Sequence, residues 1–297
     1  MKIKNFLLFV TVTAVCVPCA YGSHKLPQQS LQLVPGVGLF ADIGKRVNQE
    51  DRFFCEKIDE TYVFGIFDGH NGHEGAEYAK NNFPVFFKEA YGSTLDKMKI
   101  ALRKIENSDL FKRNERCGTT AILACIDSKK ENIFIANVGD SRLLLEKNGT
   151  VDFVTEDQKP NRSDEKMRIE LSRGTVSFYE GTWRVDCYLA MSRVIGNWFI
   201  KRTGHVIADP ECFMKQLTPE NKFLVIASDG LWDGMNNVDL VKFLTNYNHK
   251  VSEKIIAWTL GLKAMEKSKD NVTVMVVNLQ KLGLNSVKPD YERIQRS

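Results

Sequence analysis

Short apolar runs alternate with amphipathic stretches along this chain. The apolar runs are rich in β-branched and aromatic residues, a composition typical of strands that are at least half buried. Four of them stand out, at residues 62–67, 132–138, 223–227 and 271–277. The pattern therefore predicts a protein that contains several short, buried strands.

Between the strands, apolar residues recur at the spacing of a helix that buries one face. Two such stretches, at residues 76–90 and 95–105, follow each other and predict a helical hairpin. A second pair is predicted at residues 238–247 and 252–266. Pro84 lies inside the first stretch, and we expect it to kink or interrupt that helix because proline has no backbone N–H to donate.

Strand hairpins combined with helix pairs favour sheets that pack together and carry helices on the outside. No stretch rich in Pro, Gly or Ser divides residues 39–279, so we expect this part of the chain to be one domain. The sequence shows no repeat of 20 to 50 residues, which argues against a solenoid.

The first residues differ in kind from the rest. Lys2 and Lys4 precede an apolar stretch at residues 6–20, and the stretch ends in Ala20-Tyr21-Gly22, which is the order of parts in a signal peptide. The apolar stretch is shorter than the about 20 residues that a spanning helix needs. We therefore expect residues 1–22 to be a signal peptide that is cleaved from a secreted protein. The alternative is a membrane-anchored protein that keeps its first 22 residues.

Composition and charge exclude further classes. The chain has 297 residues, of which 43% are hydrophobic and 26% charged, as in ordinary globular proteins. Its net charge of +4 and the lack of any run of five Lys or Arg residues argue against a nucleic-acid partner. After the leader, the cysteines are odd in number and form no CxxC pair, so we expect small core residues rather than a disulfide framework.

Acidic residues mark the ends of the predicted strands. Asp68, Asp140 and Asp229 follow three of the apolar runs, and Asp270 precedes the fourth. Taken singly, an Asp beside a Gly is typical of a tight turn. In antiparallel strands, however, these four carboxylates would share one rim, where they repel one another unless a cation lies among them. Carboxylate oxygens without a Cys or His pattern favour Mg²⁺ or Mn²⁺ over zinc.

Ordered motifs around these acids carry a family resemblance. The chain resembles the type 2C metal-dependent Ser/Thr protein phosphatases over about residues 37–279, nearly all of the expected mature protein. The motifs follow the order found in that family. They are RVNQED at 46–51, FDGHNGH at 67–73, CGTTA at 117–121, ANVGDSR at 136–142, DQKP at 157–160, EKMRI at 165–169, RV at 184–185, LAMSR at 189–193, ASDGLWD at 227–233 and DNVT at 270–273.

The resemblance implies a fold and a domain division. The fold is an α+β, antiparallel β-sandwich flanked by helix pairs on both outer faces (αββα). The phosphatase domain would cover residues 37–282, after the signal peptide and an N-terminal extension at 23–36, and a C-terminal tail at 283–297 would follow. We expect a monomer.

The resemblance also implies a metal centre. Asp68 would bridge two ions of Mg²⁺ or Mn²⁺, with Glu50 and the backbone carbonyl of Gly69 on one ion and Asp229 and Asp270 on the other. Such a pair of ions activates a water molecule for direct attack on a phosphate ester. The substrate would be a protein that carries phosphoserine or phosphothreonine.

Two further residues would act on the substrate itself. The guanidinium of Arg46 matches the oxygens of a phosphate in geometry and charge. His70 would be the general acid that protonates the leaving oxygen, since its ordinary pKa of about 6.5 suits proton transfer near neutrality.

Three departures from the family pattern stand out. In relatives, a weaker third metal site uses the acids aligned to Asp140 and Asp233 together with an aspartate where this chain has Asn197. We expect this possible third site to be weakened by the loss of a carboxylate. Asn71 replaces a frequent glycine after His70, and Arg173 replaces a glycine that precedes Gly174.

A second function remains open at this point. A secreted pseudophosphatase would use the same fold as a binding protein without turnover. The four retained carboxylates at positions 50, 68, 229 and 270 argue for the enzyme, whereas Asn197 is the feature that keeps the alternative open.

Overall fold

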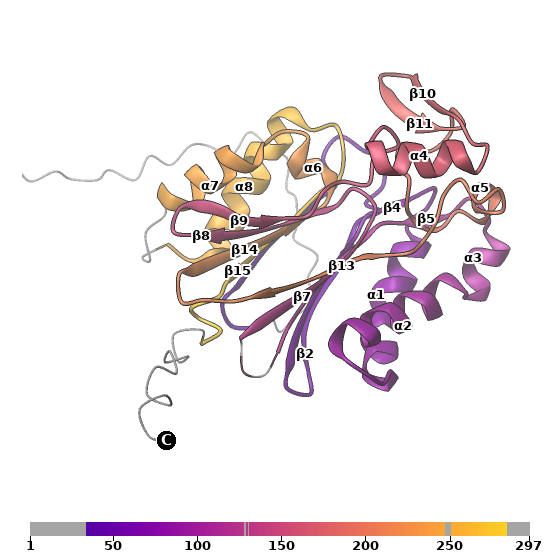
Figure 1. Cartoon of the computed structure of the whole chain (residues 1–297). Coiled ribbons are helices and arrows are strands. Elements are labelled where there is room, and N and C mark those ends of the chain that lie inside the picture. Colours follow the sequence, from indigo (N-terminus) through magenta and orange to yellow (C-terminus); the bar gives the residue numbers. More distant parts are fainter. Residues whose placement is uncertain (1–33, 128, 130, 247–250, 284–297) are drawn as a thin grey trace, which may run out of the picture. The chain divides into compact units, whose positions relative to one another are not determined.

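Two five-stranded antiparallel sheets form the centre of the protein in the computed structural model (Figure 1). The structure describes residues 34–127, 129, 131–246 and 251–283, which belong to one compact unit. The expected signal peptide, residues 23–33 of the extension and residues 284–297 of the tail lie outside the described residues. No helix in the described part is long and apolar enough to cross a membrane.

The first sheet contains the β3 strand, at whose end the DGH motif begins. Its register pairs Arg52 with Phe67, so Asp68 leaves the sheet at the end opposite the β2–β3 turn. The strand order is β13-β7-β6-β3-β2. The bounds are Arg52–Ile58 for β2, Thr61–Phe67 for β3, Ala121–Ile126 for β6, Asn132–Val138 for β7 and Glu211–Gln216 for β13.

The second sheet contains the strands next to Asp229 and Asp270. The order is β1-β15-β14-β8-β9, all antiparallel, and β15 runs against both β1 and β14. The bounds are Val37–Asp42 for β1, Arg142–Lys147 for β8, Thr150–Val154 for β9, Asn221–Ala227 for β14 and Val272–Asn278 for β15.

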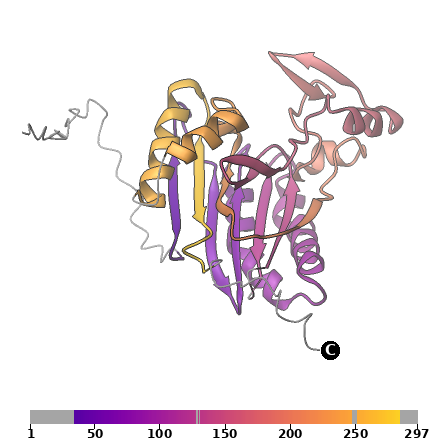
Figure 2. The ribbon, with the colours of Figure 1, turned by 60° about the vertical axis from the view of Figure 1, so that its left-hand side comes forward.

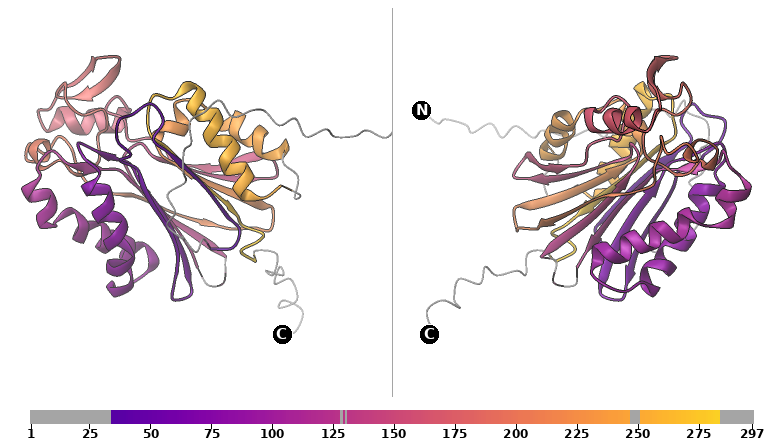
Figure 3. Two further views of the ribbon diagram at one scale, coloured as in Figure 1. Left: turned by 180° about the vertical axis from the view of Figure 1, so that it is seen from behind. Right: turned by 45° about the vertical axis from the view of Figure 1, so that its right-hand side comes forward.

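The two sheets pack face to face over a hydrophobic core (Figures 2 and 3). Successive side chains of a strand point to opposite faces. In β3, Phe64 and Ile66 therefore join the core between the sheets, while Val63 and Phe67 join the core under the helices. Burial on both faces explains why this strand is a continuous apolar run in the sequence.

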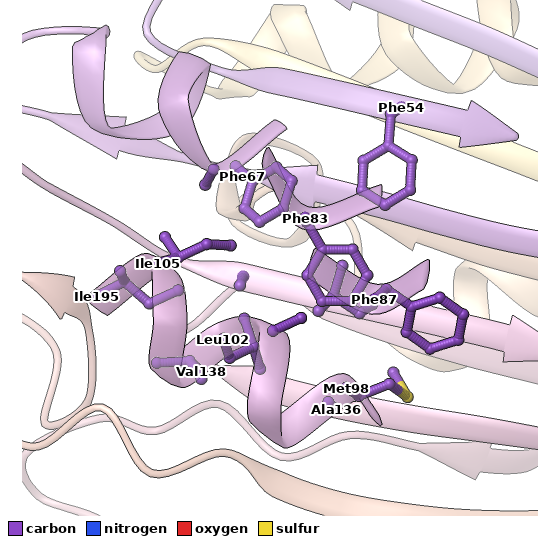
Figure 4. Close-up of a cluster of buried hydrophobic side chains, with 14 of the residues drawn as sticks. Phe54, Phe67, Phe83, Phe87, Met98, Leu102, Ile105, Ala136, Val138 and Ile195 are labelled. Atoms are coloured by element: carbon purple, nitrogen blue, oxygen red, sulfur yellow. The ribbon is translucent and has the colours of Figure 1, made fainter. Parts of the chain in front are cut away.

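Helices α1 (Glu74–Glu89) and α2 (Thr94–Glu106) cover the outer face of the first sheet. Figure 4 shows Phe83 and Phe87 of α1 beside Phe54 and Phe67 of the sheet. Pro84 lies within α1, which continues through it, so the expected interruption does not occur. The buried phenylalanines on both sides of Pro84 hold this part of the helix against the sheet.

Helices α7 (Asn237–Asn246) and α8 (Glu253–Lys267) cover the outer face of the second sheet. In α8, Ile256 and Leu260 pack on the same apolar cluster as Val225 and Val274 of the strands. The α+β sandwich with helices on both outer faces is confirmed, as are the two predicted helix pairs.

Shorter elements lie at the rim where the acidic residues gather. Three two-residue strands form a small sheet in the order β12-β5-β4. A helix and a hairpin, α4 and β10–β11, stand together near it (Figure 1). The bounds are Gly69–His70 for β4, Gly118–Thr119 for β5, Ile195–Gly196 for β12, Asp109–Arg113 for α3, Ser163–Leu171 for α4, Val176–Tyr179 for β10, Thr182–Val185 for β11, Trp198–Lys201 for α5 and Asp229–Trp232 for α6.

The cysteines in the described part are all free thiols. Cys55, Cys117 and Cys125 are buried and fill the core as expected, and Cys212 is half-buried. Cys187 is exposed, so the expectation of a core residue is wrong there. It lies in the turn that follows β11 and has a φ of 58°.

Candidate metal centre

Carboxylates from both sheets gather around Asp68. Burial raises the pKa of Asp68 well above its ordinary value, and the charges of Asp51, Asp229, Asp140 and Asp270 raise it further. Charges act in this way only where the groups face one another across a short, poorly solvated space. The structure therefore brings the four predicted strand-end acids to one rim.

The backbone of Asp68 is held firmly in place. Its N–H donates to Thr120 Oγ1 at 3.0 Å, and its carbonyl accepts from the Thr120 N–H at 2.8 Å. Thr120 is fully buried next to β6 in the first sheet. The acid thus leaves β3 on a backbone that the neighbouring strand fixes.

Asp229 occupies a similar environment on the second sheet. Burial raises its pKa well above the ordinary value, the charges of Asp140, Asp270 and Asp233 add to this, and the ammonium of Lys159 opposes it. One side-chain oxygen of Asp229 and one of Asp140 are buried without a hydrogen-bond partner in the described structure. Buried carboxylate oxygens that lack donors fit a hard cation.

Glu50 and Gly69 lie side by side at the same rim. Glu50 Oε1 accepts from the N–H of Gly72 at 2.8 Å. A Cβ atom on Gly69 would lie 2.7 Å from the backbone oxygen of Glu50, so only glycine allows this close approach. The arrangement is consistent with Glu50 and the carbonyl of Gly69 as neighbouring ligands of one ion.

Two residues of the centre were missed from the sequence. Asn271 is buried and donates from Nδ2 to the carbonyls of Ile43 and Asn48, each at 2.9 Å, while its Oδ1 accepts from the N–H of Glu50 at 2.8 Å. It fixes the loop that carries Arg46 and Glu50. A neutral amide that contacts only backbone leaves no charge pattern in a sequence.

Asp51 is the second missed residue. Burial raises its pKa to about 6, although hydrogen bonds from Thr273 and Ser228 lower it. Its Oδ2 accepts from the hydroxyl of Ser228 at 2.8 Å, which ties the first sheet to the second behind the metal centre. Its place directly after Glu50 in the RVNQED motif was the available signal.

Arg46 lies at the open side of the centre. Its Nη2 donates to Asp270 Oδ2 at 2.6 Å, and its side chain is 56% exposed. Burial tends to lower the pKa of Arg46, but the charges of Asp270, Asp229 and Asp68 raise it. The guanidinium is therefore next to the carboxylates and open to an incoming anion.

His70 follows Gly69 in the short strand β4. Its Nε2 contacts Asn197 Oδ1. Burial lowers the pKa of His70, while the hydrogen bond to Asn197 and the charges of Asp140 and Glu50 raise it. The carboxylates at the rim therefore act electrostatically on the imidazole.

The residues expected at a third metal site each have partners in the protein. Burial raises the pKa of Asp233. The charge of Asp140 raises it further, whereas the ammonium of Lys159 lowers it. Lys159 Nζ lies 2.5 Å from Asp140 Oδ2. Both polar groups of the Asn197 side chain have protein partners, Oδ1 with His70 Nε2 and Nδ2 with the carbonyl oxygen of Arg116.

A separate acidic cluster has a different character. Oxygens of Asp164, Glu165 and Glu211 lie within 4.8 Å of one another. Arg162 and Arg193 make ion pairs with these acids, and Arg193 Nη2 is 2.6 Å from Glu165. This cluster is neutralised by protein side chains and anchors α4.

Comparisons with known proteins show which family the chain resembles. The family model described as "Protein phosphatase 2C" matches residues 40–272. The chain is 39% identical over 250 residues to "Probable protein phosphatase 2C 52" of Oryza sativa subsp. japonica, covering 80% of this chain and 49% of that protein. It is 33% identical over 268 residues to "Protein phosphatase 1L" of Bos taurus, covering 82% and 72%.

Solved structures show the same fold. A serine-threonine phosphatase 2C from Toxoplasma gondii superposes with a TM-score of 0.70 at 22% identity, over 83% of this chain and 97% of that one. A C. elegans sex-determining protein gives a TM-score of 0.75 at 24% identity, over 82% and 65%. The chain spans about half the length of the first rice relative and 63% of the length of a second, "Probable protein phosphatase 2C 7".

Proposed function

The chain belongs to the protein phosphatase 2C family, and from that premise we propose that it hydrolyses phosphoserine and phosphothreonine in proteins with the help of Mg²⁺ or Mn²⁺. The observation that carries the proposal is the convergence of buried carboxylates at one rim of the sandwich. The pKa values of Asp68 and Asp229 are raised first by burial and then by their acidic neighbours, which is unfavourable without a cation.

We propose that the residues at this rim would hold two ions. Asp68 would serve both, Glu50 and the carbonyl of Gly69 would hold one of them, and Asp229 and Asp270 would hold the other. When bound, such a pair lowers the pKa of a water molecule enough for it to attack a phosphate ester near neutral pH.

The chain's own residues bind the substrate and handle the proton. Arg46 is exposed beside Asp270 and would bind the phosphate oxygens of the substrate through its guanidinium. His70 would donate a proton to the seryl or threonyl oxygen as the P–O bond breaks. The alternative of a pseudophosphatase is not supported, since the matched relatives are named as phosphatases and the carboxylates are retained.

The test is hydrolysis of a phosphoserine peptide by the purified chain with Mg²⁺, with Mn²⁺ or with a chelator. We expect turnover only with a metal, and a loss of at least about 100-fold in Asp68→Ala and Asp229→Ala, because each removes a metal ligand. Glu60→Ala, in the exposed turn at the other end of the β2–β3 hairpin, is the matched control and should keep full activity. Wild-type turnover in chelator or in Asp68→Ala would refute the mechanism.

We also propose that residues 1–22 direct the protein into the secretory pathway and are then removed. The support is the order of charge, apolar stretch and small residues at the N-terminus. N-terminal sequencing of protein secreted from a eukaryotic host should start near Ser23. Recovery of the intact N-terminus from the membrane fraction would favour the anchored form.

A further inference from the structure

The small sheet β12-β5-β4 places Asn197 opposite His70. Gly118 in β5 pairs with His70 on one side and with Gly196 on the other. Asn197 follows Gly196 directly, and its N–H donates to the carbonyl of Cys117 at 2.9 Å. The three paired strands therefore bring His70 and Asn197 into contact, although they are 127 positions apart in the sequence.

The two side chains meet over a glycine. A Cβ atom on Gly118 would lie 2.2 Å from Asn197 Oδ1 and 2.6 Å from His70 Nε2. Any other residue at this position would separate the imidazole from the amide. The sequence thus leaves space for this one contact, and Asn197 is completely buried in making it.

The orientation of the amide follows from its second partner. Asn197 Nδ2 donates to the carbonyl oxygen of Arg116 at 2.7 Å, and a carbonyl can only accept. The atom that faces His70 is therefore Oδ1, which is also only an acceptor. His70 must then carry a hydrogen on Nε2, because otherwise two acceptors would face each other.

We propose that Asn197 is a positioning residue that holds the imidazole of His70 with its hydrogen on Nε2 and leaves Nδ1 for the reaction. This rests on the proposed function. Nδ1 has no hydrogen-bond partner among the residues that the structure describes. In the step, the Nδ1 proton of the imidazolium passes to the leaving oxygen, which takes the electron pair of the breaking P–O bond. The neutral imidazole that remains keeps its Nε2 hydrogen on Asn197.

The amide is required by the loop around Arg116. The carbonyl of Arg116 also accepts from Asn71 Nδ2 at 3.1 Å. Asn71 and Asn197 both have a left-handed backbone, with φ of 54° and 51°. A carboxylate at position 197 would accept from His70 but would face the Arg116 carbonyl without a hydrogen to donate. Two departures from the family pattern therefore belong to one arrangement around His70.

The first experiment compares two leaving groups. General acid catalysis matters for a seryl oxygen and little for p-nitrophenolate, which departs without protonation. We expect Asn197→Ala to lower kcat on a phosphoserine peptide about 100-fold and on p-nitrophenyl phosphate less than about 3-fold. Asn197→Asp keeps an acceptor for Nε2 and should recover at least about 10-fold of the loss on the peptide.

The double variant His70→Ala/Asn197→Ala should be no slower on the peptide than His70→Ala, because a positioning residue has nothing to position once the imidazole is gone. Asn221→Ala is the matched control, since Asn221 is also completely buried and donates to the carbonyl of Glu146 at 3.2 Å. Any change that Asn221→Ala causes in kcat should be the same for the peptide and for p-nitrophenyl phosphate. Equal losses on both substrates for Asn197→Ala, or losses that add to those of His70→Ala, would overturn the proposal.

Two measurements do not depend on turnover. In ¹⁵N spectra of neutral histidine, the signal that His70→Ala removes should show the Nε2–H tautomer in the wild type and a mixture in Asn197→Ala. Calorimetry should give the same Mg²⁺ and Mn²⁺ affinities for wild type, Asn197→Ala and Asn197→Asp. An Nδ1–H tautomer in the wild type, or tighter metal binding by Asn197→Asp, would overturn the proposal. If the wild type had no phosphatase activity at all, the proposed function would fail while the tautomer would still be decided.

Discussion

Arg46 is subject to two opposing demands at the metal centre. It makes an exposed ion pair with Asp270, which we assign as a metal ligand, and we also assign it to binding of the substrate phosphate. Removing it should weaken substrate binding. The same change should also free Asp270 and remove a positive charge that repels a cation.

We therefore predict opposite changes in two affinities for Arg46→Ala. KM for a phosphoserine peptide should rise about 10-fold, because a charge-assisted contact is lost. The metal Kd should fall by a factor of about 2 to 5, as expected for an exposed ion pair of up to about 1 kcal/mol. Steady-state kinetics and calorimetry measure the two. Lys57→Ala, which removes the same charge at the far β2–β3 turn, should change neither.

Weaker metal binding by Arg46→Ala would contradict this prediction. It would mean that Arg46 orients Asp270 for the cation and does not compete with it. An unchanged KM would remove Arg46 from the phosphate site.

At the scale of single residues, the sequence identifies site residues that are charged and that stand together in one motif. Asp68, Gly69 and His70 stand in one motif beside a strong strand, so their place at the rim was predictable. The contacts of Asn197 and Asn271 were not, since each amide binds groups from distant parts of the chain. For Asn197 the family pattern suggested a metal site, whereas the small sheet places it against His70.

One buried carboxylate links the α4 helix to the segment that carries Arg193. Glu165 is 1% exposed and accepts from Arg193 Nη2 at 2.6 Å and from Arg168 Nη2 at 2.9 Å. Burial alone would raise its pKa, but hydrogen bonds from Arg193, Ser192 and Arg168 lower it to about 2. Because the folded pKa lies below the unfolded value of about 4.3, ionised Glu165 stabilises the fold above that pH.

We predict that Glu165→Gln lowers the free energy of unfolding by on the order of 3 kcal/mol at pH 7, from a pKa difference of about 2.3 units. The difference from wild type should stay constant down to about pH 5 and shrink as the pH falls from there towards 2. Urea unfolding at pH 7, 5 and 3.5 measures it. Glu170→Gln, an exposed acid of the same helix, should change stability by less than about 0.5 kcal/mol. An equal loss at pH 7 and pH 3.5 would show that shape, not charge, matters at this position.

Elements were predictable where burial leaves a periodic pattern. The strands β3, β7, β14 and β15 and the four long helices follow from apolar spacing alone, because each packs a whole face against another layer. The two-residue strands β4, β5 and β12 have too few residues to show a period, and their pairing is set by contacts far apart in the sequence. These are the elements that position His70, so the local structure around the proposed general acid could not be predicted from the sequence.

Across the whole domain, the candidate metal centre draws its carboxylates from both sheets. Asp68 leaves β3 of the first sheet, whereas Asp229 and Asp270 adjoin β14 and β15 of the second. Without a cation, these acids repel across the rim of the sandwich, as the raised pKa of Asp68 from burial and its neighbours shows. A bound ion would replace that repulsion with attraction to both sheets at once, so metal binding should stabilise the fold as well as enable the chemistry.

We therefore predict that Mg²⁺ or Mn²⁺ at about 100 times its Kd raises the Tm of the wild type by about 5 to 10 °C, since ligand binding at that level adds about 2.7 kcal/mol and each kcal/mol is worth about 2 to 4 °C in a domain of this size. Asp229→Asn should respond differently from the wild type. In chelator it should melt at or above the Tm of the wild type because one repelling charge is gone, and metal should raise its Tm by less than about 2 °C. Differential scanning calorimetry measures both.

Asp59→Asn is the matched control and should respond to metal like the wild type. The Asp59 backbone has a φ of 51°, which asparagine tolerates, and its turn lies at the opposite end of the sheet. A lower Tm for Asp229→Asn in chelator would mean that the carboxylate stabilises the metal-free fold through contacts of its own, and that repulsion is not what the cation relieves.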